Sequence, residues 1–257
     1  MTRTRRQFLL GAAAVGAAVV GLSSSGSADA HWLPDHVTVA GDGGEELEKY
    51  APSLITLPGQ RQKMQGLYGI WMDSTEHDLR AYMYWLRYSH QDSLLDGIPL
   101  VGELFSRDAH LGDHEPFIAF VDVATGEVRE TVYTGYHHYG VHLTGDQINL
   151  AERAVDNRET HVVLRVIDPH HHYRLGDPGR GALASNLTSL NSFLEAYPRW
   201  DDRGIWDSSD RETVTDPWRA RERGHWWRDG SIDKRLADIR LFLNWRDAGD
   251  RDTLIRD

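Results

Sequence analysis

The hydrophobic and polar positions along the chain form short runs that predict β-strands more often than helices. Four runs are dense in aromatic and β-branched residues, are bounded by turn residues, and cover 81–88, 117–121, 128–139 and 161–168. Between the second and third, Ala124-Thr125-Gly126-Glu127 is typical of a hairpin turn. We therefore expect residues 117–123 and 128–139 to form an antiparallel hairpin, with Val128, Val132 and His138 on one face of the return strand.

Helical periodicity is confined to a few places. Thr144 and Gln147 fit a capping box, and the apolar positions that follow fit one helical face through residue 155. Residues 185–197 and 232–245 also carry apolar side chains at helical spacing. The segment 198–231 between them is rich in tryptophan, aspartate and arginine, and we interpret it as a loop that large aromatic side chains hold against the core.

These elements predict a mainly β fold, an antiparallel β-sandwich with helical insertions and a C-terminal helix. Residues 31–66 contain Pro52, Pro58 and an Asp42-Gly43-Gly44 turn, so we expect an irregular lead-in there. The sequence shows no internal repeat and no long linker. We therefore expect residues 67–257 to form a single domain.

The first residues, 1–30, have the features of an export signal. Arg5-Arg6 precedes an apolar run over 8–22, which is shorter than the ~20 residues that a membrane span needs. Ala28-Asp29-Ala30 is a small-x-small cleavage site. We expect export by the twin-arginine pathway to the cell envelope or exterior, and a mature chain without an integral membrane span. The alternative is that the segment stays attached as a short anchor.

The amino-acid composition excludes some kinds of site and partner. The chain has no cysteine, which excludes disulfides, thiolate metal sites and a cysteine nucleophile. Its net charge is −11, which argues against nucleic acid as a partner. Of its 14 histidines, ten lie between His90 and His172, and this clustering draws attention to metal binding.

The candidate site begins immediately before the strand at 117–121. His110, Asp113 and Glu115 lie within six residues, and Gly112 gives the backbone freedom to turn between them. Because side chains alternate along a strand, Asp113 and Glu115 should face one way and His114 the other. From the later histidine groups, 137–138 and 170–172, we select His138 and His170 as further ligands. Carboxylates alone favour Ca²⁺ or Mg²⁺, which we expect over Zn²⁺ or Mn²⁺, whereas two or more imidazoles would reverse that preference.

The pattern His110-x-Gly112-Asp113-x-Glu115 before an apolar strand resembles the His-x-Gly-Asp-Trp-Glu motif of a secreted β-sandwich superfamily. Its members include the necrosis-inducing Nep1-like proteins and a fungal vacuolar-sorting-associated family. The strands at 81–88 and 161–172 are similar to two further strands of that superfamily. The resemblance implies a divalent cation at His110, Asp113 and Glu115, and in some members a sphingolipid head group as ligand. This chain has His114 in place of the motif tryptophan. The Nep1-like version of the motif has a histidine directly before the aspartate, where this chain has Gly112, so cytolytic activity does not follow.

Two functions fit these features. The first is an exported protein that holds a divalent metal and binds a glycan or lipid head group. The second is a metal-dependent hydrolase of an ester or phosphodiester that uses the same residues. A structural envelope protein without metal is a third possibility. The absence of a nucleophile elbow or an HExxH motif favours the first function.

Overall fold

A larger β-sheet forms the centre of the molecule in this computed structural model, which describes residues 32–89, 113–135, 138–151, 159–168, 171–203, 208–224 and 226. The strand order in this sheet is β1-β3-β4-β5-β6-β7, and every pair along this path is antiparallel. A short strand, β11, adds to β3 in parallel. The bounds are β1 Val37–Gly41, β3 Met64–Ser74, β4 Leu79–Tyr88, β5 His114–Asp122, β6 Glu127–Thr134, β7 Gly140–Thr144 and β11 Leu190–Ser192.

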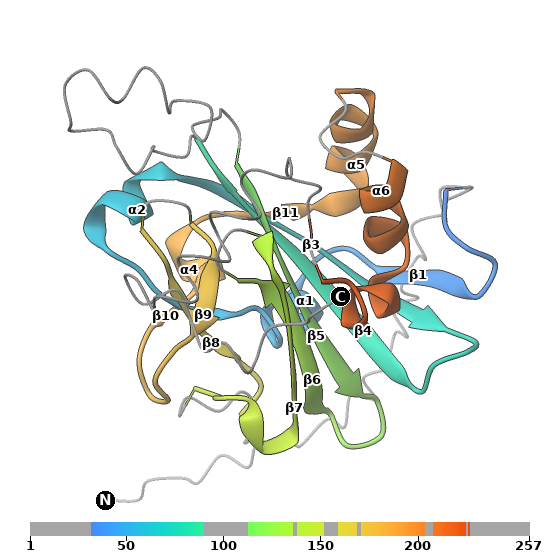
Figure 1. The fold of residues 1–257 in the computed structure, drawn as a ribbon, viewed down its shortest axis with the longest axis horizontal. Helices are drawn as coiled ribbons and strands as arrows, with labels where there is room; N and C mark the ends of the chain where they lie inside the picture. The colour runs from blue at the N-terminus through green and yellow to red at the C-terminus, as the bar shows by residue number, and fades with distance from the viewer. Residues whose placement is uncertain are drawn as a thin grey trace, which may run out of the picture.

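A smaller sheet lies on one side of the larger one, while α5 and α6 lie on the other (Figure 1). Its order is β10-β2-β8-β9, and β2 and β8 run parallel. Its strands are β2 Ser53–Ile55, β8 Val163–Val166, β9 Tyr173–Leu175 and β10 Ala182–Leu183. The mainly β fold with antiparallel sheets and few helices is therefore confirmed, with two parallel pairs added to it.

The helices in the described residues are short. They are α1 Glu45–Glu48, α2 Pro58–Lys63, α4 Ala184–Leu187, α5 Phe193–Asp202 and α6 Ser208–Thr215, with 3₁₀ turns η3 Gly145–Gln147 and η4 Pro217–Arg221. Across the part of the chain that the structure describes, none of these helices has the length and apolar character needed to cross a membrane.

Strand β4 explains why the larger sheet is buried on both faces. Tyr82, Tyr84 and Leu86 alternate toward the smaller sheet, where they join a core that includes Leu54 and Leu164. Met83 and Trp85 point to the opposite face. Because successive side chains point to opposite faces, a strand that is apolar at nearly every position needs a cover on each side.

The tryptophans of the C-terminal half supply the second cover. Trp200 in α5, Trp218 in η4 and Trp226 are all buried in the same hydrophobic cluster as Trp85 and Phe193. The interpretation that large aromatics hold this segment against the core is confirmed for these three positions. Much of the segment is helical rather than loop-like, because α5, α6 and η4 lie in it.

The β5–β6 hairpin is confirmed, but its return strand differs from the expectation. A bulge interrupts the pairing between Phe120 and Val121, where β6 carries the extra residue Arg129. The bulge places Val128 in the core between the sheets and Val132 in the core on the other face. Our expectation that these two valines share a face was therefore wrong.

Three local expectations are corrected by the structure. The capping box at 144–147 starts only the 3₁₀ turn η3, and Ile148 after it is extended, with φ −89° and ψ 123°. The expected helix over 185–197 is two helices, α4 and α5, separated by β11. The lead-in at 31–66 is not irregular, because β1, β2 and the start of β3 lie within it. The signal segment 1–30 and the expected helix 232–245 lie outside the described residues.

The face of β6 that points away from the smaller sheet carries a group of ion pairs around Glu130. This group makes the free energy of unfolding depend on pH. Glu130 accepts a hydrogen bond from His142 Nε2 at 2.9 Å and pairs with Arg221 Nε at 2.9 Å. The hydrogen bond from His142 and the charge of Arg221 hold the pKa of the Glu130 carboxyl below its ordinary value, although partial burial opposes them. The ionised carboxylate therefore stabilises the fold above the ordinary pKa, and this contribution is lost as the pH falls through the lowered one.

We expect Glu130→Gln to lower the melting temperature near neutral pH, and its difference from wild type to close as the pH falls through the lowered pKa of the Glu130 carboxyl. The measurement is the melting temperature of both proteins across that range. A difference that stays constant down to the acid limit would show that the carboxylate charge contributes nothing.

Candidate metal centre

The alternation of β5 places Glu115 inside the sandwich and His114 outside it, as the sequence predicted. Glu115 is fully buried, and its Oε2 accepts a hydrogen bond from the Thr134 hydroxyl on the neighbouring strand. His114 instead lies edge-on to Trp200, with ring centroids 4.6 Å apart. Asp113 is also buried and on the Glu115 side, where it contacts a histidine of the β8–β9 turn.

That turn carries His172 directly before β9. The Ile167 N–H donates to the His172 carbonyl at 2.8 Å, and the His171 N–H donates to the Ile167 carbonyl at 2.9 Å. His172 is buried, and its Nε2 lies 3.6 Å from Glu115 Oε1. The turn between two strands of the smaller sheet therefore brings an imidazole against a carboxylate of the larger sheet.

His138 approaches the same point from the bend between β6 and β7. Its φ of 63° lies in the left-handed region, which histidine adopts more readily than most residues. Its Nδ1 lies 3.1 Å from His172 Nε2, and its carbonyl accepts a hydrogen bond from the Trp226 N–H at 2.9 Å. The expected return strand through residue 139 was wrong, because β6 ends at Thr134 and His138 lies on the bend that follows.

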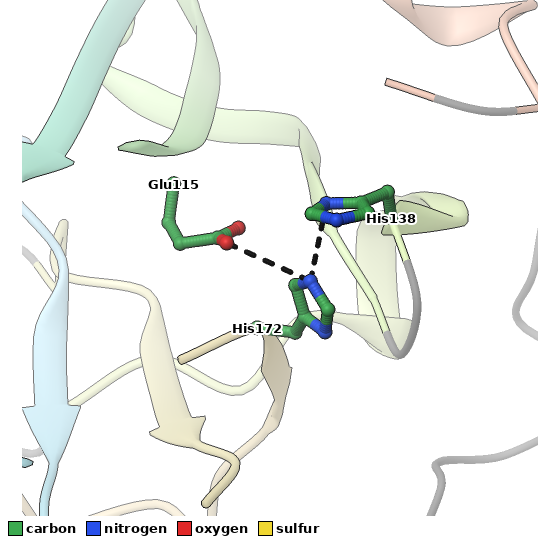
Figure 2. Close-up of side chains that lie close together, drawn as sticks. All are labelled: Glu115, His138 and His172. Atoms are coloured by element: carbon green, nitrogen blue, oxygen red, sulfur yellow. Dashed lines mark hydrogen bonds and ion pairs between the residues drawn. The ribbon is translucent and has the colours of Figure 1, made fainter. Parts of the chain in front are cut away.

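Glu115, His138 and His172 form a buried group that could hold a metal ion (Figure 2). One donor atom from each residue lies within 4.8 Å of the other two. Ligands at ~2.1 Å from a tetrahedral ion are ~3.4 Å apart, so the separations of 3.1 and 3.6 Å around His172 Nε2 fit such an ion. In the absence of an ion, one of the two imidazoles would donate a hydrogen bond to the other.

Two tyrosine hydroxyls near the group are affected by burial and by the negative charges of Glu115 and Asp113. Burial, and then the charges of Glu115 and Asp113, raise the pKa of the Tyr88 hydroxyl well above its ordinary value. The Tyr173 hydroxyl, which donates to the Glu115 carbonyl at 3.4 Å, has a raised pKa mainly because it is fully buried. Because burial raises the free energy of a charged carboxylate, a buried carboxylate either takes up a proton or pairs with a cation.

Neither a family model nor a curated protein matches the sequence. Among solved structures, one similar chain is described as "Necrosis and Ethylene inducing Protein 2 from the causal agent of cocoa's Witches Broom disease". It has 14% identity and a TM-score of 0.37 over 71% of this chain and 85% of that one. Another, described as "Toxin fold for microbial attack and plant defense", has 13% identity and a TM-score of 0.37 over 58% of this chain and 74% of that one.

These neighbours agree with a weak resemblance to necrosis-inducing proteins. At this identity and score the likeness says nothing about the motif residues, the ligand or the activity. The assignment of the site therefore depends on the side chains of this chain alone.

The structure brings together two of the five residues that we selected, Glu115 and His138. Asp113 lies nearby but outside the group, and His110 and His170 fall outside the described residues. His172 was missed. Because His170 and His172 would share a face on an extended strand, alternation offered no reason to prefer one.

Proposed function

We propose that this protein binds one divalent metal ion through Glu115, His138 and His172. The observation that carries the proposal is the convergence of three buried donor groups from three separate segments. The carboxylate is fully buried and faces two imidazoles, which is the arrangement in which a bound cation offsets the cost of burying the charge.

The donor set favours Zn²⁺ or Mn²⁺. Only one of the two motif carboxylates belongs to the group, and it is joined by two imidazoles. Imidazole nitrogen suits zinc and other transition metals, whereas Ca²⁺ and Mg²⁺ prefer an all-oxygen shell. This proposal reverses the preference for Ca²⁺ or Mg²⁺ that we drew from the carboxylates of the sequence.

Three protein ligands leave one tetrahedral position for an outside group. We propose that an oxygen of a glycan or lipid head group takes this position. The alternative is a bound water that the metal activates for ester or phosphodiester hydrolysis. A hydrolase would also need a free carboxylate as base, and Asp113 is already hydrogen-bonded to His171, which favours the binding function.

Metal binding is tested by titration calorimetry on the stripped protein with Zn²⁺, Mn²⁺, Ca²⁺ and Mg²⁺. We expect one Zn²⁺ or Mn²⁺ per chain, and no measurable binding by Glu115→Gln or His172→Ala. His142→Gln is the matched control, because His142 also pairs with a glutamate but lies outside the group. The proposal is wrong if no ion binds wild type more tightly than about 1 mM, equivalent to about −4.1 kcal/mol.

The ligand is tested with glycan arrays and with vesicles that display defined lipid head groups. Retention by the metal-loaded wild type, but not by the stripped protein or Glu115→Gln, would support the binding function. Metal-dependent turnover of a chromogenic ester or phosphodiester would favour the hydrolase instead.

We also propose export by the twin-arginine pathway. The support is Arg5-Arg6 before the apolar run 8–22 and the Ala28-Asp29-Ala30 cleavage site. We expect replacement of both arginines by lysine to retain the protein inside the cell, as measured by fractionation. Undiminished export of the double variant would show that another route carries it.

A further inference from the structure

A second carboxylate–imidazole pair lies beside the proposed metal ligands. His171 Nδ1 donates to Asp113 Oδ2 at 2.9 Å, with both side chains at most 1% exposed. The His171 ring stacks on Tyr88, with ring centroids 3.9 Å apart and planes 6° from parallel. Tyr88 in turn donates its backbone N–H to the Asp113 carbonyl at 2.8 Å. The imidazole is therefore held at its edge by a carboxylate and across its face by an aromatic ring.

The contacts with Asp113 and Tyr88 hold His171 in an uncommon backbone conformation. Its φ is 61°, in the left-handed region that residues with a side chain rarely adopt. The neighbouring residue is His172, whose Nε2 points to Glu115 and His138. A rotation of the His171 backbone would change the direction in which His172 leaves the turn.

The carboxylates of the two pairs lie at the beginning of β5, with Asp113 directly before the strand and Glu115 within it. Asp113 and Glu115 are two residues apart and face the same side, and each contacts one of two consecutive histidines of the β8–β9 turn. The larger sheet therefore fixes the position of the turn through Asp113 while it presents Glu115 to His172. No comparable arrangement follows from the sequence motif, in which Asp113 was itself a candidate ligand.

We propose that Asp113 and His171 are positioning residues of the metal centre, and that Asp113 is not a ligand. The inference rests on the proposed function. The Asp113 carboxylate fixes the His171 ring, the fixed ring holds the left-handed backbone at His171, and that backbone aims His172 Nε2 at the ion. Outer partners of this kind typically affect metal affinity by about 10–100-fold, whereas loss of a ligand removes the site.

The test measures zinc affinity by competition with a chromophoric chelator, and the ligand field of the Co²⁺-loaded protein by its visible absorption spectrum. We expect Asp113→Ala to bind one ion per chain with affinity lowered about 10–100-fold. Asp113→Asn keeps an oxygen that can accept the His171 N–H, so we expect most of the affinity to return. Because Asp113→Asn keeps the size and shape of the buried side chain, it also provides a folded variant if Asp113→Ala does not fold.

A matched pair of histidine variants separates positioning from general packing. His161 is fully buried like His171, and its Nδ1 lies 2.9 Å from the Ala51 carbonyl, the same distance as in the His171–Asp113 pair. We expect His161→Gln to lower the melting temperature and leave zinc affinity and the Co²⁺ spectrum unchanged. His171→Gln should lower the affinity about 10–100-fold and shift the spectrum.

The outcomes distinguish this inference from the proposed function. No metal binding by wild type would overturn both. Wild-type binding with an undiminished Asp113→Ala affinity, or equal effects of His161→Gln and His171→Gln on affinity, would overturn the positioning role alone. Complete loss of binding in folded Asp113→Asn, matching Glu115→Gln, would show that Asp113 is a ligand and would also overturn it.

Discussion

Removal of the metal ion is expected to lower the melting temperature of the wild-type protein by roughly 5–11 °C. An ion that binds only the folded state stabilises it by about 2.7 kcal/mol at a hundredfold excess over Kd, and each kcal/mol shifts the melting temperature of a chain of this size by about 2–4 °C. The ion would link Glu115 of the larger sheet to His172, directly before β9 of the smaller sheet, so its loss weakens the contact between the sheets. The measurement is a thermal melt with Zn²⁺ and then with excess chelator.

Glu115→Gln provides the control for this result. Its amide oxygen can still accept the Thr134 hydroxyl, so the packing is kept while the charge is lost. We expect its melting temperature to be the same with and without chelator. An equal response of wild type and Glu115→Gln would place the ion elsewhere on the protein.

The second large effect is expected at Trp85. Its side chain is fully buried on the outer face of the larger sheet, 6.2 Å from the Phe193 ring and 6.1 Å from the Trp226 ring between centroids. Replacement of such a side chain by alanine costs about 3–5 kcal/mol, because apolar burial is lost and a cavity remains. That is a large share of the roughly 5–15 kcal/mol that stabilises a typical domain. Urea denaturation of Trp85→Ala measures the loss.

Leu57→Ala is the control, because Leu57 is 55% exposed and such surface changes usually stay within about 0.5 kcal/mol. If Trp85→Ala lost less than about 1 kcal/mol, the outer face would not be covered by α5 and η4 in solution.

The sequence predicted best where alternation along a strand decided the result. The aromatic run at 81–88 became β4, and the faces of Asp113, His114 and Glu115 followed directly from the period of two. These positions depend only on the local pattern and on which side chains avoid water. Trp200, Trp218 and Trp226 were similarly predictable as core residues, because large aromatic side chains gain most from burial.

The sequence could not predict the features that depend on left-handed or irregular backbone. His138 and His171 both have positive φ, which glycine commonly signals but histidine does not. The bulge at Arg129 reverses the faces of β6 with no residue that marks it. Spacing could not single out His172, because its approach to Glu115 and His138 depends on a turn whose backbone is left-handed at His171.

The two parallel strand pairs determine when this chain can complete its fold. Strand β3 pairs with β11, and Leu190 follows its partner Leu67 by 123 residues (190 − 67). Strands β2 and β8 are similarly far apart in the sequence, and Ser53 lies opposite Val163. Because such distant pairings require closure of long loops, folding of both sheets cannot finish during synthesis until the segment through Ser192 has left the ribosome.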